Sequence, residues 1–139
     1  MDKKNTRRQL TLFTDKKYSQ EIENVRRQFN IIQQQLIDSH VTLCREHEIE
    51  NINAVLDNLK QLDAPKIVIR FGQVTRFENG SGVLLPSLGD NEDFHLLRSR
   101  ILNNLGTTVS RHEPHITLMH PRNSTCTDEI FSAIQKINL

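Results

Sequence analysis

"DSHVTLCRE" at residues 38–46 and "EPHITLMHPRN" at residues 113–123 contain the same pattern of histidine, apolar residue, threonine and leucine. Successive side chains of a β-strand point to opposite faces, so His40 and Thr42 would share one face and the two apolar residues the other. The second string repeats this arrangement with His115. Each string therefore predicts a half-buried strand that presents one imidazole and one hydroxyl on the same side.

Amphipathic helices are predicted around both strings, because apolar residues recur there at steps of three and four. These helical stripes cover residues 18–36, 49–62, 94–105 and 130–137. Strand-like segments lie at residues 9–14, 39–43, 66–72, 83–85 and 115–118. Pro65 is predicted to close the second helix, Asp90 to cap the third, and Thr127 or Asp128 to open the last. The predicted element order is β-α-β-α-β-β-α-β-α.

The spacing of the two strings predicts two pseudo-equivalent lobes. They lie 75 positions apart in a chain of 139 residues, which is about half its length. This period is too long for a solenoid repeat. No low-complexity segment or Pro/Gly-rich linker divides the chain, so we expect a single bilobal domain over residues 1–139. Residues 1–8 are predicted to form a flexible basic arm.

Charge and composition exclude several classes of protein. The chain carries 18 basic and 17 acidic residues, a formal net charge of +1, which does not fit a dedicated nucleic-acid coat protein. Its two cysteines, Cys44 and Cys126, have no disulfide-framework spacing and indicate a reducing compartment. The N-terminus lacks a secretory apolar region, and no apolar run approaches ~18 residues. A cytoplasmic protein without membrane spans is predicted.

The two strings together supply a complete set of groups for displacement at phosphorus. Imidazole exchanges a proton near neutral pH, and a threonine hydroxyl can donate a hydrogen bond to an oxyanion. If the lobes place the strands side by side, one imidazole can deprotonate a nucleophile while the other protonates the departing oxygen. The hydroxyls would hold the non-bridging phosphate oxygens. We therefore predict His40, Thr42, His115 and Thr117 as catalytic residues.

The paired strings HVTL and HITL, with their spacing and flanking helices, resemble the 2H phosphoesterase superfamily. The nearest branch is the bacterial 2′-5′ RNA ligase and cyclic phosphodiesterase family, and the resemblance covers the chain from about residue 9 onward. It implies an α+β bilobal fold, with two antiparallel sheets lining a central cleft and helices outside. It also implies metal-independent chemistry, without cofactors, on 2′,3′-cyclic phosphates or 2′-5′ linkages of RNA or nucleotides. Members of this family usually continue into a further strand, whereas this sequence stops at Leu139.

Three further residues are predicted to contact substrate. Arg45 and Arg122 follow the two strings, and guanidinium groups at the mouth of a phosphate site would pair with phosphate oxygens. Phe77, beside a Gly-rich turn, is the candidate for stacking on a base. Ordinary solvated arginines and a packed phenylalanine are the alternatives. No metal site is predicted, since Cys44 and His47 at Cys-x-x-His spacing have no second ligand pair.

The favoured function is hydrolysis of a 2′,3′-cyclic phosphate or 2′-5′ phosphodiester at an RNA end or on a nucleotide. The first alternative is a 2′-5′ RNA ligase that uses the same site with an RNA 5′-hydroxyl as nucleophile. A second is a non-catalytic RNA- or nucleotide-binding module, and a third is a structural domain of a larger complex. A monomer is expected.

Overall fold

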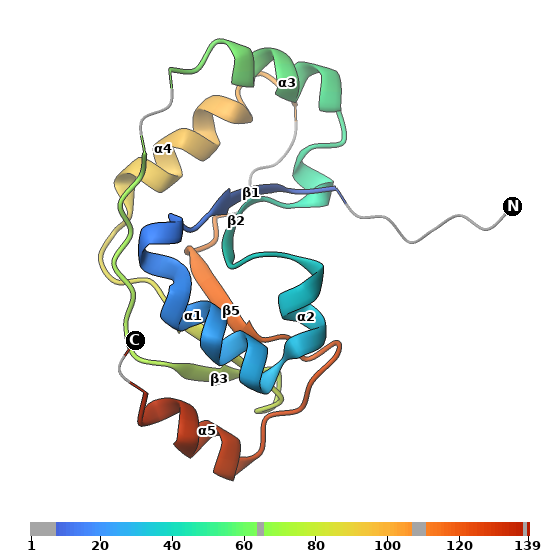
Figure 1. Cartoon of the computed structure of the whole chain (residues 1–139). Helices are drawn as coiled ribbons and strands as arrows, with labels where there is room; N and C mark the ends of the chain where they lie inside the picture. Colours follow the sequence, from blue (N-terminus) through green and yellow to red (C-terminus); the bar gives the residue numbers. More distant parts are fainter. Residues whose placement is uncertain (1–7, 64–65, 107–110, 138) are drawn as a thin grey trace, which may run out of the picture.

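The computed structural model describes residues 8–63, 66–106, 111–137 and 139. Its strands form one antiparallel sheet of five strands in the order β1-β2-β5-β4-β3 (Figure 1). The strands are β1 (Leu10–Phe13), β2 (His40–Cys44), β3 (Thr75–Phe77), β4 (Gly82–Pro86) and β5 (His115–Met119). The two strings found in the sequence are thus β2 and β5, and they lie next to each other at the centre of the sheet.

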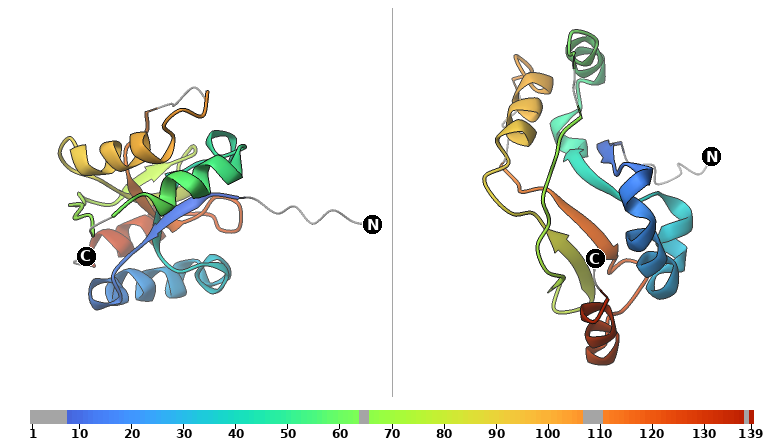
Figure 2. Two further views of the ribbon diagram at one scale, coloured as in Figure 1. Left: turned by 90° about the horizontal axis from the view of Figure 1, so that it is seen from above. Right: turned by 60° about the vertical axis from the view of Figure 1, so that its left-hand side comes forward.

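The helices form two pairs and one separate helix. They are α1 (Lys16–Phe29), α2 (Ile31–Leu36), α3 (Ile52–Lys60), α4 (Glu92–Ile101) and α5 (Asp128–Gln135), with a 3₁₀ turn at Glu46–Glu48. Figure 2 shows α1 and α2 on one side of the molecule and α3 and α4 on the other, with strands between them. None of the helices within the described residues has the length and apolar composition needed to cross a membrane.

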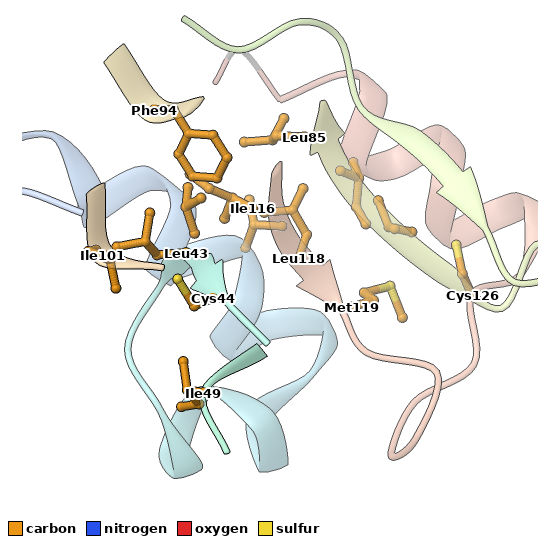
Figure 3. Packing of buried hydrophobic residues seen from close by; sticks show 14 of the residues in the cluster. Leu43, Cys44, Ile49, Leu85, Phe94, Ile101, Ile116, Leu118, Met119 and Cys126 are labelled. Carbon is orange, nitrogen blue, oxygen red and sulfur yellow. The ribbon is translucent and has the colours of Figure 1, made fainter. Parts of the chain in front are cut away.

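The apolar residues of the two strings form the centre of the core. Val41 and Leu43 are 4% exposed, and Ile116 and Leu118 are 0% and 1% exposed. Buried side chains from four helices join them in one cluster: Val25, Val55, Phe94, Ile101 and Ile134. Figure 3 shows how Phe94, Leu43 and Ile116 pack together. The predicted alternation in HVTL and HITL is confirmed, because both strands have the same burial pattern along their length.

The first helical stripe is divided into two helices, contrary to the sequence prediction. Asn30 separates α1 from α2, with the non-helical dihedrals φ −151° and ψ 61°. Its side chain is engaged elsewhere, since Oδ1 accepts from the His120 N–H and Nδ2 donates to Asn123. Asparagine side chains compete with the helix for such bonds. Tyr18 and Leu36, which the stripe placed on the apolar face, are exposed.

The strand predicted at residues 66–72 is also wrong. This segment is extended, and Phe71 makes an isolated bridge to Ser87. Its backbone bonds to the last residue of β4 and the chain just after it: the Gly72 N–H donates to the Pro86 carbonyl, and the Leu88 N–H donates to the Arg70 carbonyl. The chain then turns at Gly89, which has a positive φ of 81°. Residues 66–70 therefore have too short a partner for a strand, and β3 at Thr75–Phe77 takes that place in the element order.

The other helix boundaries are mostly as predicted. Thr127 caps α5, accepting from the Ile130 N–H at 3.2 Å, which confirms the predicted start. The residue before α4 is Asn91 in place of Asp90, and it makes no capping bond with its side chain. Pro65 and residues 1–7 of the predicted basic arm lie outside the described residues. The described strands belong to one sheet, since β2 bonds directly to β5, and a second sheet with separate lobes is not seen among them.

Candidate active site

The pairing of β2 with β5 brings the two sequence strings together. Val41 lies opposite Ile116 in the antiparallel register. Continuing this register by one residue in each direction sets His40 opposite Thr117 and Thr42 opposite His115. Residues opposite each other in a sheet point to the same face, so all four polar side chains share the face opposite to Val41 and Ile116. Each of the four is half-buried.

These four side chains form a rectangle in which the two histidines occupy diagonal corners. Cβ atoms of directly opposed residues lie ~4.5–5.5 Å apart, and diagonal neighbours lie ~7–8 Å apart. A tetrahedral phosphate placed between diagonal corners can meet one imidazole on each side and a hydroxyl at each remaining corner. Neither threonine hydroxyl has a hydrogen-bond partner among the described residues in this structure, so both remain available to such a ligand.

Both imidazoles are held in the same way. Nδ1 of His40 lies 2.8 Å from the Asp38 carbonyl, and Nδ1 of His115 lies 3.5 Å from the Glu113 carbonyl. A carbonyl oxygen only accepts, so the proton sits on Nδ1 in each ring, as assigned from this bonding. In the neutral rings Nε2 is then the basic nitrogen. The contact to Asp38 is the closer of the two.

His115 is poised to stay neutral. Burial lowers the pKa of His115, and the positive charges of Arg45 and His40 lower it further, while the bond to the Glu113 carbonyl acts in the opposite direction. Burial has this effect because the charged imidazolium loses hydration. The neutral ring, with a free lone pair on Nε2, therefore persists to lower pH than in an ordinary histidine.

Arg45 lies near His115, although it follows the other histidine in sequence. The antiparallel pairing explains this, because the end of β2 lies beside the start of β5. The Arg45 side chain is exposed, and its backbone N–H donates to Glu48 Oε1 at 3.0 Å. Glu48 is in turn held by Arg98, with Nη2 to Oε2 at 2.6 Å. A buried ion pair thus fixes the turn that presents Arg45 to the His115 corner.

His112 supports the same corner of the site through a contact with β2. Its Nε2 donates to the Thr42 carbonyl at 3.1 Å, and its ring packs edge-on against Phe94 at 5.6 Å. Burial is the main cause that lowers the pKa of His112. The local sequence does not indicate this role, and only the fold shows that His112 supports β2.

The described contacts of Arg122 and Phe77 are with residues outside the group of two histidines and two threonines. Arg122 lies in the loop that follows β5, and its guanidinium donates to Gln33 Oε1 at 3.2 Å. This loop is at the end of the sheet where β2 begins. Phe77 is on the edge strand β3, separated from β5 by β4. A Cβ on Gly82 would lie 2.6 Å from the Phe77 ring, so that ring is packed over the glycine.

Phe13 is an aromatic neighbour of the site that the sequence did not single out. It lies opposite His40 in the β1–β2 register, and their ring centroids are 6.2 Å apart in an edge-on arrangement. The ring is 60% exposed, so most of it is free to contact a ligand. The alternation of residues 9–14 places Phe13 on one face with Thr11, but only the pairing with β2 shows that this is the histidine face.

The remaining candidates do not form a metal site in the part of the chain that the structure describes. No group of three or more His, Cys, Asp or Glu side chains with suitable geometry occurs there. Cys44 and Cys126 are buried free thiols. Burial is the main cause that raises the pKa of Cys44, to about 11, so it is a poor nucleophile at neutral pH.

Comparison with known proteins gives a match to a protein family. The family model of the 2′-5′ RNA ligase superfamily matches residues 14–138, a range that contains both histidine strings. This confirms the resemblance expected from the sequence. No curated protein and no solved structure matches the chain.

Proposed function

Because the chain belongs to the 2′-5′ RNA ligase superfamily, we propose that it is a metal-independent phosphoesterase that opens the 2′,3′-cyclic phosphate of an RNA end or nucleotide. The observation that carries this proposal is the β2–β5 pairing at Val41 and Ile116, which sets two histidines and two threonines on one face. A 2′-5′ phosphodiester would present the same phosphorus chemistry to these groups.

In the proposed reaction His115 acts as the general base. Its lowered pKa and Nδ1–H tautomer leave Nε2 as a proton acceptor at neutral pH. A water molecule attacks phosphorus as Nε2 of His115 takes its proton. The bond between phosphorus and one ribose oxygen breaks, and protonated His40 donates the Nε2 proton to that oxygen. The product is a phosphate monoester with one free ribose hydroxyl, and both histidines exchange protons with water before the next cycle.

The threonines and Arg45 are proposed to bind the phosphate. Hydroxyls of Thr42 and Thr117 would donate to the two non-bridging oxygens, whose negative charge grows in the transition state. Arg45, close enough to His115 to lower its pKa, would add positive charge at that corner. Phe13 is proposed as the platform for the base next to the phosphate, because its ring is exposed beside His40. The arginine of the other loop, Arg122, is the weaker candidate.

Ligation remains the alternative, with an RNA 5′-hydroxyl in place of water at the same site. A fluorescent substrate with a terminal 2′,3′-cyclic phosphate separates the possibilities. We expect a phosphate monoester to accumulate in excess EDTA, and no joined product when a 5′-hydroxyl RNA is added. Joined product would identify the ligase. A thermal shift with 2′-AMP or 3′-AMP but no turnover would identify a nucleotide-binding module. The absence of both a thermal shift and turnover would indicate a structural domain.

A further inference from the structure

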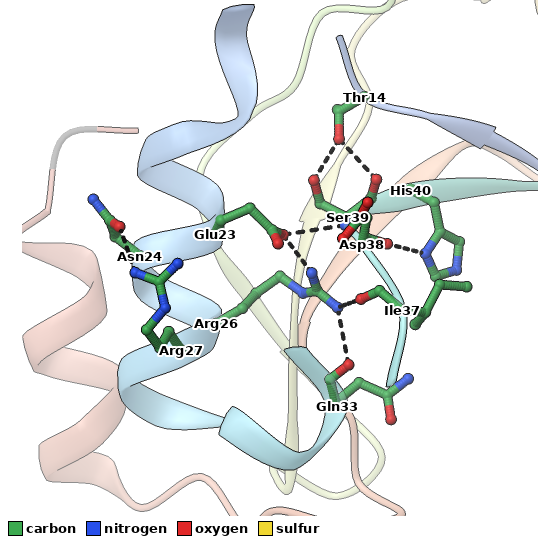
Figure 4. Close-up of polar contacts among 10 residues, drawn as sticks. All are labelled: Thr14, Glu23, Asn24, Arg26, Arg27, Gln33, Ile37, Asp38, Ser39 and His40. Carbon is green, nitrogen blue, oxygen red and sulfur yellow. Dashed lines mark hydrogen bonds and ion pairs between the residues drawn. The ribbon is translucent and has the colours of Figure 1, made fainter. Parts of the chain in front are cut away.

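One peptide group connects His40 to a half-buried carboxylate. The carbonyl of Asp38 accepts from His40 Nδ1 at 2.8 Å. The N–H of the same peptide group, on Ser39, donates to Glu23 Oε1 at 3.1 Å. Figure 4 shows these two contacts on opposite sides of the Asp38–Ser39 link. His40 and Glu23 are therefore joined through one amide, although 17 positions separate them in the sequence.

The planarity of the peptide group makes this connection directional. The C=O and N–H of a trans peptide lie in one plane and point in opposite directions. Fixing the N–H on Glu23 therefore fixes the direction of the Asp38 carbonyl toward the imidazole. A carboxylate at the N–H end also polarises the amide, which strengthens the carbonyl as an acceptor. Both effects favour a ring of His40 with its proton on Nδ1 and Nε2 facing the site.

Arg26 holds Glu23 in this position. The Arg26 side chain is 2% exposed and pairs with Glu23 through Nη1. Its Nη2 donates to the Ile37 carbonyl at 2.6 Å, one residue before the linking peptide begins. On the other side, the N–H and hydroxyl of Thr14 both donate to the Ser39 carbonyl. Three successive peptide groups before His40 are thus each held by a buried or half-buried side chain: Arg26, Glu23 and Thr14.

The second histidine lacks this connection for a chemical reason. His115 Nδ1 lies 3.5 Å from the Glu113 carbonyl, the equivalent peptide of the other string. The residue that follows Glu113 is Pro114, which has no N–H. The Glu113–Pro114 peptide group therefore cannot donate a hydrogen bond to a carboxylate. The strings "DSH" and "EPH" therefore differ in the one atom that the connection requires.

We propose that Glu23, held by Arg26, is a positioning residue that acts through the Asp38–Ser39 peptide to fix the ring orientation and Nδ1–H tautomer of His40. Its importance for turnover rests on the proposed function. The tautomer itself does not, and it can be measured in a protein without any activity.

The test uses ¹⁵N NMR of the histidine rings at alkaline pH, where the shifts of Nδ1 and Nε2 show which nitrogen carries the proton. We expect wild-type His40 to be almost entirely Nδ1–H. Glu23→Gln should produce a mixture of tautomers at His40 and leave the His115 signals unchanged, since His115 has no such connection. Glu21→Gln, an exposed carboxylate of the same helix, is the matched control for the change of charge.

A second pair of variants leaves both side chains of the Glu23–Arg26 ion pair unchanged. Ser39→Pro removes the N–H and puts a proline before the histidine, as in the second string. Ser39→Ala keeps the N–H and loses only the hydroxyl. Ser39→Pro should reproduce the tautomer mixture, and Ser39→Ala should not. In a cyclic-phosphate assay, Glu23→Gln should lower kcat about tenfold, ~1.4 kcal/mol in the barrier, with KM little changed.

The NMR results decide the proposal even without turnover. A wild-type His40 that is mainly Nε2–H would overturn it, whether or not any variant folds. So would a folded Glu23→Gln or Ser39→Pro protein with an unchanged His40 ring. A loss of kcat without any change of the ring would assign Glu23 a structural role only. Absence of turnover in the wild type, with the expected tautomers, would refute the proposed function and leave the positioning intact.

Discussion

Replacing His115 by alanine tests the two-histidine site most directly. In the proposed reaction, His115 Nε2 accepts the proton of the attacking water, and no other described group at that corner can replace it at neutral pH. Arg45 is always protonated, and the Thr42 hydroxyl is too weak a base. The third group, His112, donates through Nε2 to the Thr42 carbonyl, and its Nδ1 is buried away from water. A positioned general base typically contributes 10²–10⁴-fold. We therefore expect kcat/KM on a 2′,3′-cyclic nucleotide to fall by at least ~10²-fold in His115→Ala.

The fold should tolerate this change. His115 is half-buried, and its one described hydrogen bond, to the Glu113 carbonyl, is long at 3.5 Å. A typical hydrogen bond contributes ~0.5–1.5 kcal/mol net to the free energy of unfolding, so the loss should stay within that range. The core residue on its other face, Ile116, is 0% exposed and remains in place. Truncating Ile116 to alanine would instead cost ~2–5 kcal/mol, which gives the scale for a true packing defect.

The assay follows kcat/KM from pH 5 to 9, with circular dichroism and urea unfolding of each variant as folding controls. The lowered pKa of His115 means that its neutral form persists as pH falls, so the acidic limb of the wild-type profile should lie below ~6.5. His47→Ala, an exposed histidine in the 3₁₀ turn, is the matched control. A His40→Ala/His115→Ala double variant should lose far less than the product of the single losses, because both act in one step. A folded His115→Ala protein with near-wild-type turnover would refute the mechanism.

Three further predictions concern Phe13, the Arg98–Glu48 pair and Cys44. Phe13→Leu should raise KM for a cyclic nucleotide about tenfold while a base-free cyclic phosphate is unaffected, since stacking on an aromatic ring contributes ~1–3 kcal/mol per base; equal effects on both substrates would exclude the platform. Arg98→Met should lower the free energy of unfolding in urea by ~3–5 kcal/mol, because it leaves the Glu48 carboxylate buried and unpaired. Burial alone would raise the pKa of Glu48, but the bonds and charge of Arg98 hold it below its ordinary value of 4.5. The pair's contribution should therefore be complete above that pH and be lost as pH falls through the lowered pKa, and an unfolding midpoint that is flat there would contradict this. Cys44, with its pKa raised to about 11, should react with a disulfide reagent at pH 8 only after unfolding, and fast labelling of the native protein would show that the thiol is accessible.

Local patterns in the sequence determined much of this protein. The alternation in HVTL and HITL fixed which side chains are buried and which share a polar face, because the two-residue period of a strand does not depend on its neighbours. The helix start at Thr127 followed from its own side chain. The family, too, could be inferred from the two strings, which lie within the matched residues 14–138.

Tertiary structure alone decided which residues meet across the chain. The break at Asn30 depends on His120 and Asn123, about 90 positions away, which bond to a side chain that would otherwise continue the helix. The segment 66–72, predicted as a strand, does not form one because the chain that it faces at the end of β4 is too short. Arg45 influences His115 because the sheet is antiparallel, and Phe13 joins the site because β1 pairs with β2. A residue's neighbours across a sheet are set by strand order and register, which no local periodicity encodes.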